Sequence, residues 1–318
     1  MHSNRSRRLS RVTPQQLRAF EATARLLSVT GAARELHLTQ PTVSVQLREL
    51  AAAVGEPLFE SAGRGIRLTQ AGEALQQTAG ELNDCWRRFE SRLAELSGLV
   101  RGSLRIAAVT TAEYFVPDLV GPFAAAHPGV EIELAVENRD GVVARLQRGI
   151  DDMAVMMMPP EDLPLDRQPF LDNPLVVIAP AGHRLAGKRL RLASLAGERW
   201  LMREPGSGTR MAAERHFAEL GFEPKVAMSL GSNEAIKHAV AAGLGIALLS
   251  MVAVRPPVGR AAATTAEGLE ILKVSGFPLR RRWSVVWRRD RPLTIAARRF
   301  IEHLGAAREL RAPRGARA

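Results

Sequence analysis

The sequence has little cysteine and few long hydrophobic runs, and both shortages are informative. Cys85 is the only cysteine among 318 residues, so no intramolecular disulfide can form and a cysteine-based metal cluster is not expected. The longest uncharged apolar run, over 239–254, is broken by two glycines and is too short for a membrane span. The basic N-terminus is not followed by an apolar stretch, so we expect no secretory signal. These absences fit a protein of the reducing cytoplasm.

Positive charge is abundant but unevenly distributed. Residues 1–70 hold ten arginines against five glutamates, and residues 271–318 hold thirteen basic against three acidic side chains. Residues 101–270 are nearly neutral, with eighteen basic and twenty acidic side chains. Basic ends are typical of proteins that bind a polyanion such as nucleic acid, and a solvated surface is the alternative.

The first seventy residues predict a helix-turn-helix. Apolar residues recur at amphipathic spacing over 14–27. Thr30 is expected to cap a short helix over 31–37, and Thr39 to cap a third helix, which tolerates a proline in its first turn. The inward face of the third helix comprises Val43, Leu47, Leu50 and Val54.

The third helix is expected to read DNA. Gln and Arg side chains can bond base edges, a valine methyl can meet a thymine methyl, and hydroxyls at a helix start can bond phosphates. A Gly-Arg-Gly turn between two short apolar segments follows, which predicts a wing-like hairpin. The candidate DNA-binding residues are Thr39, Gln40, Pro41, Thr42, Ser44, Val45 and Arg48 on the helix, with Arg64 and Arg67 on the hairpin.

A long helix is expected to begin at Thr69 and to carry a heptad seam. Its apolar residues are spaced alternately by four and three positions over three repeats, which is typical of a coiled coil. A lone helix cannot bury such a seam, so the seam packs on its own chain or, in the interpretation that we favour, against a twin. A dimer predicts a two-fold symmetric operator. The seam comprises Leu75, Ala79, Leu82, Trp86, Phe89, Leu93 and Leu96.

Strand and helix patterns alternate over 103–304, which predicts α/β lobes with a mainly parallel sheet. Strands are expected over 103–109, 130–136, 152–158, 175–179, 200–203, 227–230, 245–249 and 283–287. Helices are expected over 113–126, 142–148, 211–220, 233–242 and 295–304.

Three polar stretches follow expected strands, at the end where open α/β sheets bind ligands. V-T-T ends the first strand, R-E-P-G-S-G-T-R includes the end of the strand at 200–203, and G-S-N-E opens the helix that contains Lys237. Their hydroxyls, amide, N–H groups and cations suit an anion such as a phosphate. The candidate effector-binding residues are Thr110, Thr111, Arg203, Ser207, Gly208, Thr209, Arg210, Ser232 and Asn233.

Each of these residues also has a purely structural interpretation. Arg203 and Arg210 can pair with neighbouring glutamates, and the hydroxyls can cap helices. N-R-D at 138–140 has two interpretations, a position that faces the cleft and, as we favour, a surface turn. The three methionines at 156–158 are expected to lie in the core.

Taken together, these motifs resemble the LysR-type transcriptional regulators, from about residue 12 to about residue 300. A-A-R-E-L-H-L-T-Q-P-T-V-S-V-Q-L-R-E-L, P-L-F-E and L-T-Q-A-G-E carry the resemblance in the DNA-binding half. A-V-T-T-A-E-Y-F-V-P, N-P-L-V-V-I-A, R-E-P-G-S-G-T-R and L-G-S-N-E-A-I-K resemble the branch that regulates Calvin-cycle carbon-fixation operons, including those for RuBisCO. Two places depart from the family: Glu60, where a basic residue is frequent, and the segment 251–268.

The resemblance implies an α/β fold with three parts. These are an N-terminal winged helix-turn-helix, a long linker helix and a C-terminal two-lobed α/β regulatory domain like a periplasmic binding protein. We place them at residues 1–68, 69–98 and 99–304, followed by a basic tail at 305–318 that is expected to be disordered. The lobes would comprise about 99–165 with 270–304, and 166–269.

The resemblance also implies partners. The effector would lie in the cleft between the lobes and would be a phosphorylated Calvin-cycle metabolite or a nicotinamide or adenine nucleotide. The expected macromolecular partners are double-stranded promoter DNA, a second copy of the chain or a dimer of dimers, and RNA polymerase.

No catalytic motif accompanies these features. The chain lacks G-x-x-x-x-G-K-[ST] and G-x-S-x-G, and its seven histidines are scattered. We therefore expect no enzyme activity, no metal, no cofactor and no membrane association. Two alternatives stay open: a LysR-type regulator of another pathway that senses a non-phosphorylated organic acid, and a ligand-binding protein whose basic N-terminus is incidental.

Overall fold

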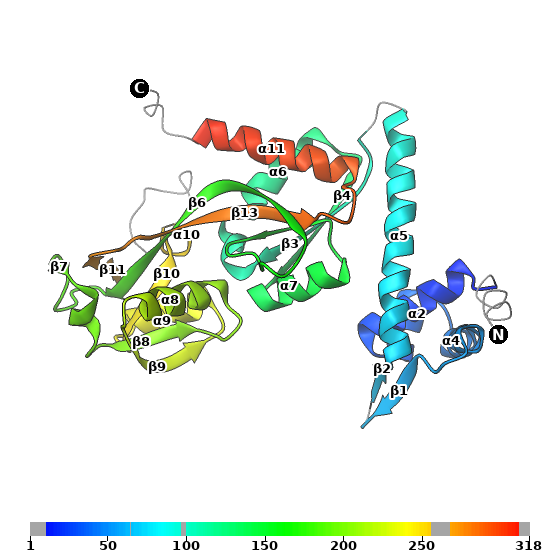
Figure 1. Cartoon of the computed structure of the whole chain (residues 1–318), viewed down its shortest axis with the longest axis horizontal. Coiled ribbons are helices and arrows are strands. Elements are labelled where there is room, and N and C mark those ends of the chain that lie inside the picture. Colours follow the sequence, from blue (N-terminus) through cyan, green and yellow to red (C-terminus); the bar gives the residue numbers. More distant parts are fainter. Residues whose placement is uncertain (1–10, 64, 97–99, 256–267, 312–318) are drawn as a thin grey trace. The chain divides into compact units, whose positions relative to one another are not determined.

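The computed structural model describes residues 11–63, 65–96, 100–255 and 268–311 (Figure 1). The chain divides into two compact units between Trp86 and Arg87, within the long helix α5 (Gln70–Leu96). None of the helices in the described part of the chain is long and apolar enough to cross a membrane.

The first unit contains three short helices and a hairpin. These are α2 (Pro14–Leu26), α3 (Val29–Glu35), α4 (Gln40–Val54), β1 (Phe59–Ala62) and β2 (Gly65–Leu68). The hydroxyl of Thr39 accepts a hydrogen bond from the amide of Thr42, so the predicted cap of α4 is confirmed. The prediction for α3 is wrong, because Ser28 and not Thr30 caps it, by accepting from the amide of Gly31. The helix therefore begins earlier than expected.

A small apolar core holds this unit together. Phe20 of α2 is fully buried and packs with Val43, Leu47 and Leu50 of α4, which confirms the predicted inward face. Ala32 and Ala33 of α3 are buried in the same cluster, where their small side chains let the helices approach closely. Burying one face of α4 leaves its opposite face for solvent or a partner.

The long helix α5 begins where predicted and exposes much of its seam. The hydroxyl of Thr69 accepts a hydrogen bond from the amide of Gly72 and so caps the helix. Near its start, Ala79 is buried and Leu75 packs on the core of the first unit. Further along, the seam residues are exposed: Leu82 by 46%, Trp86 by 63%, Phe89 by 51% and Leu93 by 48%. The side chain of Leu96 lies outside the described residues.

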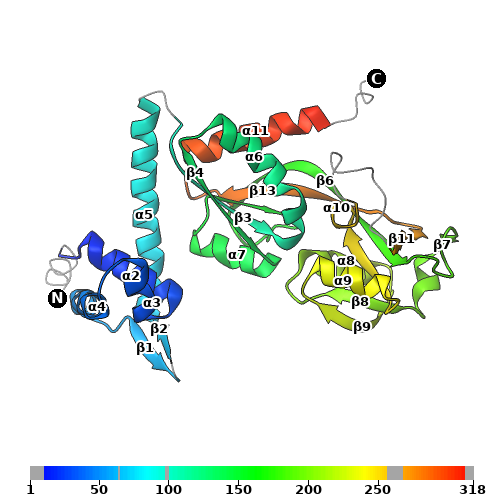
Figure 2. The same cartoon turned by 180° about the vertical axis from the view of Figure 1, so that it is seen from behind.

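The second unit is built on one sheet with the strand order β4-β3-β5-β13-β6-β10-β8-β9 (Figures 1 and 2). Its strands are β3 (Gly102–Val109), β4 (Val130–Glu137), β5 (Met153–Met156), β6 (Leu165–Pro180), β8 (Arg199–Arg203), β9 (Lys225–Leu230), β10 (Ile246–Ser250) and β13 (Leu279–Arg288). The short strand β11 (Leu269–Ile271) pairs with β6, and β7 (Arg189–Leu190) pairs with β12 (Lys273–Val274). The strands at each end of the sheet are parallel, as predicted, whereas β6 and β13 are antiparallel to each other.

Two lobes share the long strands β6 and β13. The first lobe comprises β3, β4 and β5 with the helices α6 (Val116–Ala126), α7 (Arg139–Arg148) and α11 (Ile295–Arg311). In Figures 1 and 2, α6 and α11 lie on one side of the sheet and α7 on the other. The second lobe comprises β8, β9 and β10 with α8 (Gly208–Glu219) and α9 (Asn233–Ala241). The 3₁₀ helices η1 (Thr110–Tyr114) and η2 (Leu192–Leu195) and the short α10 (Met251–Val254) complete the unit.

Alternation along the strands places the two helices of the second lobe on opposite faces of the sheet. Leu201, Ala247 and Leu249 belong to one apolar cluster with Ile236 and Val240 of α9. Their strand neighbours Trp200, Met202, Ile246 and Leu248 belong to the main core, with Ala212, Ala213 and Phe217 of α8. The period of two in strand residues thus separates two packing layers.

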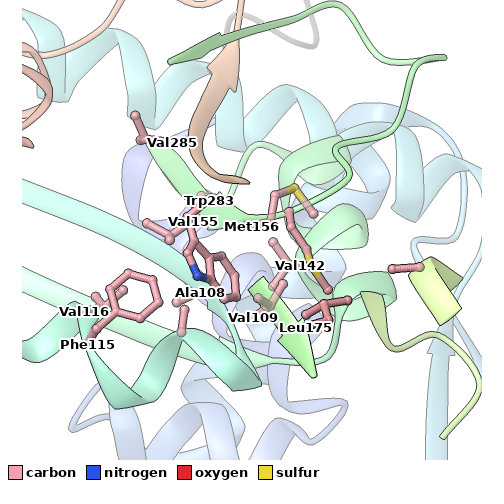
Figure 3. Packing of buried hydrophobic residues seen from close by; sticks show 14 of the residues in the cluster. Ala108, Val109, Phe115, Val116, Val142, Val155, Met156, Leu175, Trp283 and Val285 are labelled. Atoms are coloured by element: carbon pink, nitrogen blue, oxygen red, sulfur yellow. The ribbon is translucent and has the colours of Figure 1, made fainter. Parts of the chain in front are cut away.

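The core of the first lobe surrounds Trp283 of β13. This side chain is fully buried, and its ring centroid lies 5.1 Å from that of Phe115. Figure 3 shows it with Ala108 of β3 and Val155 of β5. Met156 and Met157 are buried in the same cluster, as expected for core residues.

Several predicted boundaries differ from the structure. The helix expected over 113–126 is two elements, η1 and α6, because Pro117 permits an α-helix to begin only around its own position. The segment 138–140 is no surface turn: Asn138 caps α7 by accepting from the amide of Gly141. At the C-terminus α11 continues to Arg311, into the region predicted to be a disordered tail. Residues 312–318 and most of the atypical segment, 256–267, lie outside the described residues.

Candidate functional site

The outward face of α4 presents most of the residues predicted to bind DNA. Thr39, Gln40, Pro41, Thr42, Val45 and Arg48 are exposed, and Ser44 is half-buried at the edge of the face. In the described part of the chain, Arg48 makes no ion pair and no side-chain hydrogen bond. A guanidinium with all its donors available can bond the O6 and N7 acceptors of a guanine or a phosphate.

The start of α4 holds two hydroxyls close together. The hydroxyl oxygens of Thr39 and Thr42 lie 2.7 Å apart, and the first also caps the helix. The free amides of the first turn add donors and a positive partial charge. This end of the helix therefore suits a phosphate oxygen.

The hairpin brings its arginine next to a carboxylate. Glu60 and Arg67 are paired across β1 and β2, and their side chains form an ion pair of 2.8 Å. Both side chains are well exposed, at 47% and 67%, so water screens the pair. Glu60 nonetheless gives Arg67 a partner within the chain, and the predicted contact of Arg67 with DNA stays a prediction. Arg64 lies outside the described residues, so its role stays a prediction.

The three polar stretches predicted to bind an effector come together where the two lobes meet. Thr110 and Thr111 open η1 at the carboxyl end of β3, and Arg203 ends β8. Ser232 caps α9 by accepting from the amide of Ala235, and Asn233 begins that helix. These residues are distant in sequence but joined by hydrogen bonds between lobes.

Arg203 is the centre of this network. Its side chain is almost fully buried and donates two hydrogen bonds to the Glu204 carboxylate, at 2.8 and 2.9 Å. It also donates to the Asn233 side chain at 2.6 Å and, across the lobes, to the Thr110 hydroxyl at 3.0 Å. Protein acceptors thus engage every nitrogen of its guanidinium, and Glu204 neutralises its charge. Its predicted role as a direct ligand stays a prediction.

Asn233 makes the second bond between the lobes. Its amide nitrogen lies 3.2 Å from the hydroxyl oxygen of Thr111, and both residues are buried. Its oxygen accepts from Arg203, so the amide orientation follows from the network. The alternative that Thr110 only caps a helix fails, because η1 has no side-chain cap and the Thr110 hydroxyl faces Arg203.

The amino end of α8 carries two residues with hydroxyl groups, Ser207 and Thr209. Ser207 is the residue at the cap position but makes no side-chain cap bond, and its side chain is 4% exposed. Thr209 is 3% exposed. Among the described residues, neither hydroxyl has a hydrogen-bond partner. The first amides of the helix, starting at Gly208, also lack acceptors within the helix.

Arg210 is turned toward the protein. It donates to the Glu214 carboxylate at 2.7 Å and to the backbone oxygen of Arg203 at 3.0 Å, and it lies 3.2 Å from the Ser229 hydroxyl. Arg210 thus pairs with Glu214, which is the purely structural interpretation that the sequence had left open. Its Nη2 has no acceptor among the described residues, so Arg210 keeps one donor group in addition to those at the amino end of α8.

Gly206 brings the loop of the second lobe against the first. Its φ is +83°, and a Cβ there would lie 2.7 Å from a carboxylate oxygen of Asp140. The amide of Asp140 donates to the Gly206 oxygen at 3.3 Å. The start of α7 therefore belongs to the junction, so the favoured prediction of a surface turn is wrong and the alternative that 138–140 faces the other lobe agrees with the structure.

Sequence reasoning also missed a polar group beside the site. Tyr114 of η1 donates to the carboxylate of Glu234 at 2.6 Å, and the Lys237 ammonium lies 2.7 Å from the same carboxylate. Burial and the neighbouring Glu234 raise the pKa of Tyr114. Although burial acts in the opposite direction, hydrogen bonds from Lys237 and Tyr114 hold the pKa of Glu234 below its usual value. In the described residues no group of histidine, cysteine or carboxylate side chains is arranged to hold a metal.

The two units correspond to two family models. Residues 14–73 match the bacterial regulatory helix-turn-helix protein, lysR family, and residues 97–309 match the LysR substrate binding domain. The chain belongs to the LysR family. It is therefore a LysR-type DNA-binding transcriptional regulator, with the predicted winged helix-turn-helix and two-lobed α/β regulatory domain.

Individual relatives point to one branch of the family. The chain is 42% identical to the HTH-type transcriptional activator CmpR of Synechocystis, over 94% of this chain and 96% of the relative. It is 43% identical to a RuBisCO operon transcriptional regulator of Acidithiobacillus ferrooxidans, over 93% and 94%. These relatives confirm the resemblance to regulators of carbon-fixation operons.

Two solved structures extend the comparison. The Synechocystis CcmR regulatory domain in complex with 2-PG is 40% identical and has a TM-score of 0.61, over 65% of this chain and 97% of that one. Full-length CbnR in complex with its target DNA covers 92% of this chain and 99% of its own, with a TM-score of 0.65. At 23% identity the second likeness shows the fold alone.

Proposed function

We propose that this LysR-type regulator controls carbon-fixation genes and senses a small phosphorylated anion at the amino end of α8. The relatives that it resembles regulate RuBisCO operons, and the CcmR domain binds 2-PG (2-phosphoglycolate). The relatives are regulators, so we infer that the chain is no enzyme and works on promoter DNA in the cytoplasm.

The observation that supports the anion site is the pair of hydroxyls at the start of α8 without a protein partner in the described part of the chain. Ser207 and Thr209 are more than nine-tenths buried, and neither hydroxyl has a partner among the described residues. A hydroxyl that no protein group engages can donate to a ligand, and a bound oxyanion would accept a charge-assisted hydrogen bond from each. The free amides and the positive partial charge of the twelve-residue helix favour the same ligand.

The surrounding network suits a sensing role. Thr110 and Asn233 are tied to Arg203, which is itself held by Glu204, so an anion at α8 would lie beside bonds that join the lobes. An anion whose binding changes these bonds would change the position of one lobe relative to the other. A ligand shifts a conformational equilibrium only through such differential contacts.

Calorimetry on the full chain tests this proposal. 2-Phosphoglycolate, a sugar bisphosphate and succinate are titrated into the wild type, S207A, T209A and S194A. We expect a phosphorylated ligand to bind the wild type, and each of S207A and T209A to bind it about 10- to 100-fold more weakly, since hydrogen bonds to charged groups contribute about 1.5–3 kcal/mol. Ser194, whose hydroxyl donates to the Arg191 backbone oxygen away from the junction, is the control and should bind like the wild type. Binding of succinate alone would instead favour an organic-acid sensor of another pathway.

A further inference from the structure

Within the part of the chain that the structure describes, the side-chain hydrogen bonds of η1 go to the second lobe. Thr110 accepts from Arg203, Thr111 accepts from Asn233, and Tyr114 donates to Glu234. The first two bonds engage residues of the proposed effector site. The third bond lies at the other end of η1. It joins Tyr114 to Glu234, and neither residue is a candidate for binding the effector.

The third bond is reinforced from α9. Lys237 lies one turn after Glu234, and its ammonium contacts both the carboxylate, at 2.7 Å, and the face of the Tyr114 ring, 5.4 Å from the centroid. The Lys237 side chain is only 15% exposed. A tyrosine hydroxyl, a carboxylate and an ammonium thus form a bridge between the lobes, in which the charge of Glu234 is balanced.

The bridge and the effector residues share one helix turn. Asn233, which holds Thr111, is adjacent to Glu234, which holds Tyr114. Fixing Tyr114 on α9 therefore also fixes where Thr110 and Thr111 lie relative to Arg203. A residue that holds a binding segment in its bound position raises affinity because less conformational freedom is lost on binding.

We propose that Tyr114 is a positioning residue for the effector, holding η1 on α9 through Glu234 and Lys237 so that Thr110 and Thr111 stay in place beside the segment 203–209. This inference rests on the proposed function, since it concerns the same site. Tyr114 itself touches no effector in this arrangement. Its contribution is to the affinity for the effector.

The test compares Y114F and E234Q with the wild type in calorimetry with 2-phosphoglycolate. Phenylalanine keeps the ring and removes the hydroxyl, and glutamine keeps the shape of Glu234 and removes its charge. We expect each variant to bind about three- to tenfold more weakly, a modest loss because the bridge is partly exposed to water. E219Q removes a carboxylate from an ion pair within α8 alone and should bind like the wild type.

A spectroscopic signal separates positioning from general damage. Tyr114 is the only tyrosine of the chain, so 3-fluorotyrosine labelling yields a single ¹⁹F resonance. We expect E234Q to shift this resonance without ligand, and 2-phosphoglycolate to move it in the wild type but much less in E234Q. Wild-type affinity in both Y114F and E234Q would overturn the inference and leave the proposed function intact. A wild type that binds no phosphorylated ligand would instead refute the proposed function, and an unshifted resonance in E234Q would still refute the bridge.

Discussion

Glu60 and Arg67 face each other across the hairpin of the DNA-binding unit, with a nitrogen-to-oxygen distance of 2.8 Å. The pair explains how the family departure at Glu60 acts on a residue predicted to bind DNA. A carboxylate at this position pairs with the guanidinium of Arg67 and adds negative charge to a surface that is predicted to contact DNA phosphates. The hairpin of this chain is thus expected to bind DNA less strongly than its arginine alone would allow.

Replacing Glu60 with glutamine should strengthen DNA binding. The change frees Arg67 and removes one repulsive charge, and exposed charge pairs contribute little to folding, so stability should change by less than about 1 kcal/mol. We expect affinity to rise for operator and random DNA alike, with the salt slope of log K steeper by about one. Titrations at several salt concentrations measure both. An unchanged slope would mean that Arg67 does not reach a phosphate.

Replacing Arg48 with alanine should instead reduce specificity. Arg48 is exposed on the outward face of α4 and has no competing partner among the described residues. A base contact is worth about 1–3 kcal/mol, so binding to the operator should weaken by about 5- to 100-fold, and binding to random DNA by much less. R25A, which removes an arginine already paired with Glu35, is a matched control. Equal losses on both DNAs would make Arg48 a phosphate contact.

The exposed part of the α5 seam predicts a dimer. Leu82 and Phe89 are about half exposed although both belong to the heptad pattern, and a second helix would remove them from water. The double variant L82E with F89E should therefore sediment as a monomer and bind a two-fold operator weakly. Q77E with T78E adds two charges at exposed positions off the seam and should stay a dimer. A dimeric seam variant would place the dimer contact elsewhere.

The elements that sequence could predict are those whose patterns are local. The apolar stripes of α2 and α4, the alternating strand β4 and the apolar strands β3 and β10 are set by residues within one element, and the structure has them within a few positions. The long strand β6 was predicted only over 175–179, because Pro169 and Pro174 argue against a central strand. Pro169 is accommodated next to a register shift in β13, between Trp283 and Ser284, which no local pattern could indicate.

The candidate site shows the same limit. Polar residues after strands correctly predicted that Thr110, Arg203 and Asn233 would come together. Their partners could not be predicted, because the bond from Arg203 to Thr110 joins residues 93 positions apart. Burial then changes the chemistry: a buried arginine must be neutralised, so Arg203 takes Glu204 and a network rather than standing open to an anion.

Alkaline titration of Tyr114 tests the electrostatics of the lobe junction. Because this is the only tyrosine, the near-ultraviolet absorbance of tyrosinate reports on it alone. Burial, the hydrogen bond to Glu234 and the charge of that carboxylate all raise its pKa. We expect ionisation in the folded chain to begin above the usual value of about 10, and E234Q to lower the midpoint only in part, because burial remains.

The same shift predicts how stability depends on pH. A tyrosine whose pKa is higher in the folded than in the unfolded chain contributes stability below the unfolded pKa, and this is lost as the pH rises toward the folded pKa. Glu234, whose pKa is lowered, contributes stability at neutral pH that is lost in acid. The free energy of unfolding measured in urea should therefore become similar for Y114F and the wild type above about pH 10, because keeping Tyr114 protonated in the folded wild type costs free energy there. A constant difference between the two across that range would contradict a raised pKa at Tyr114.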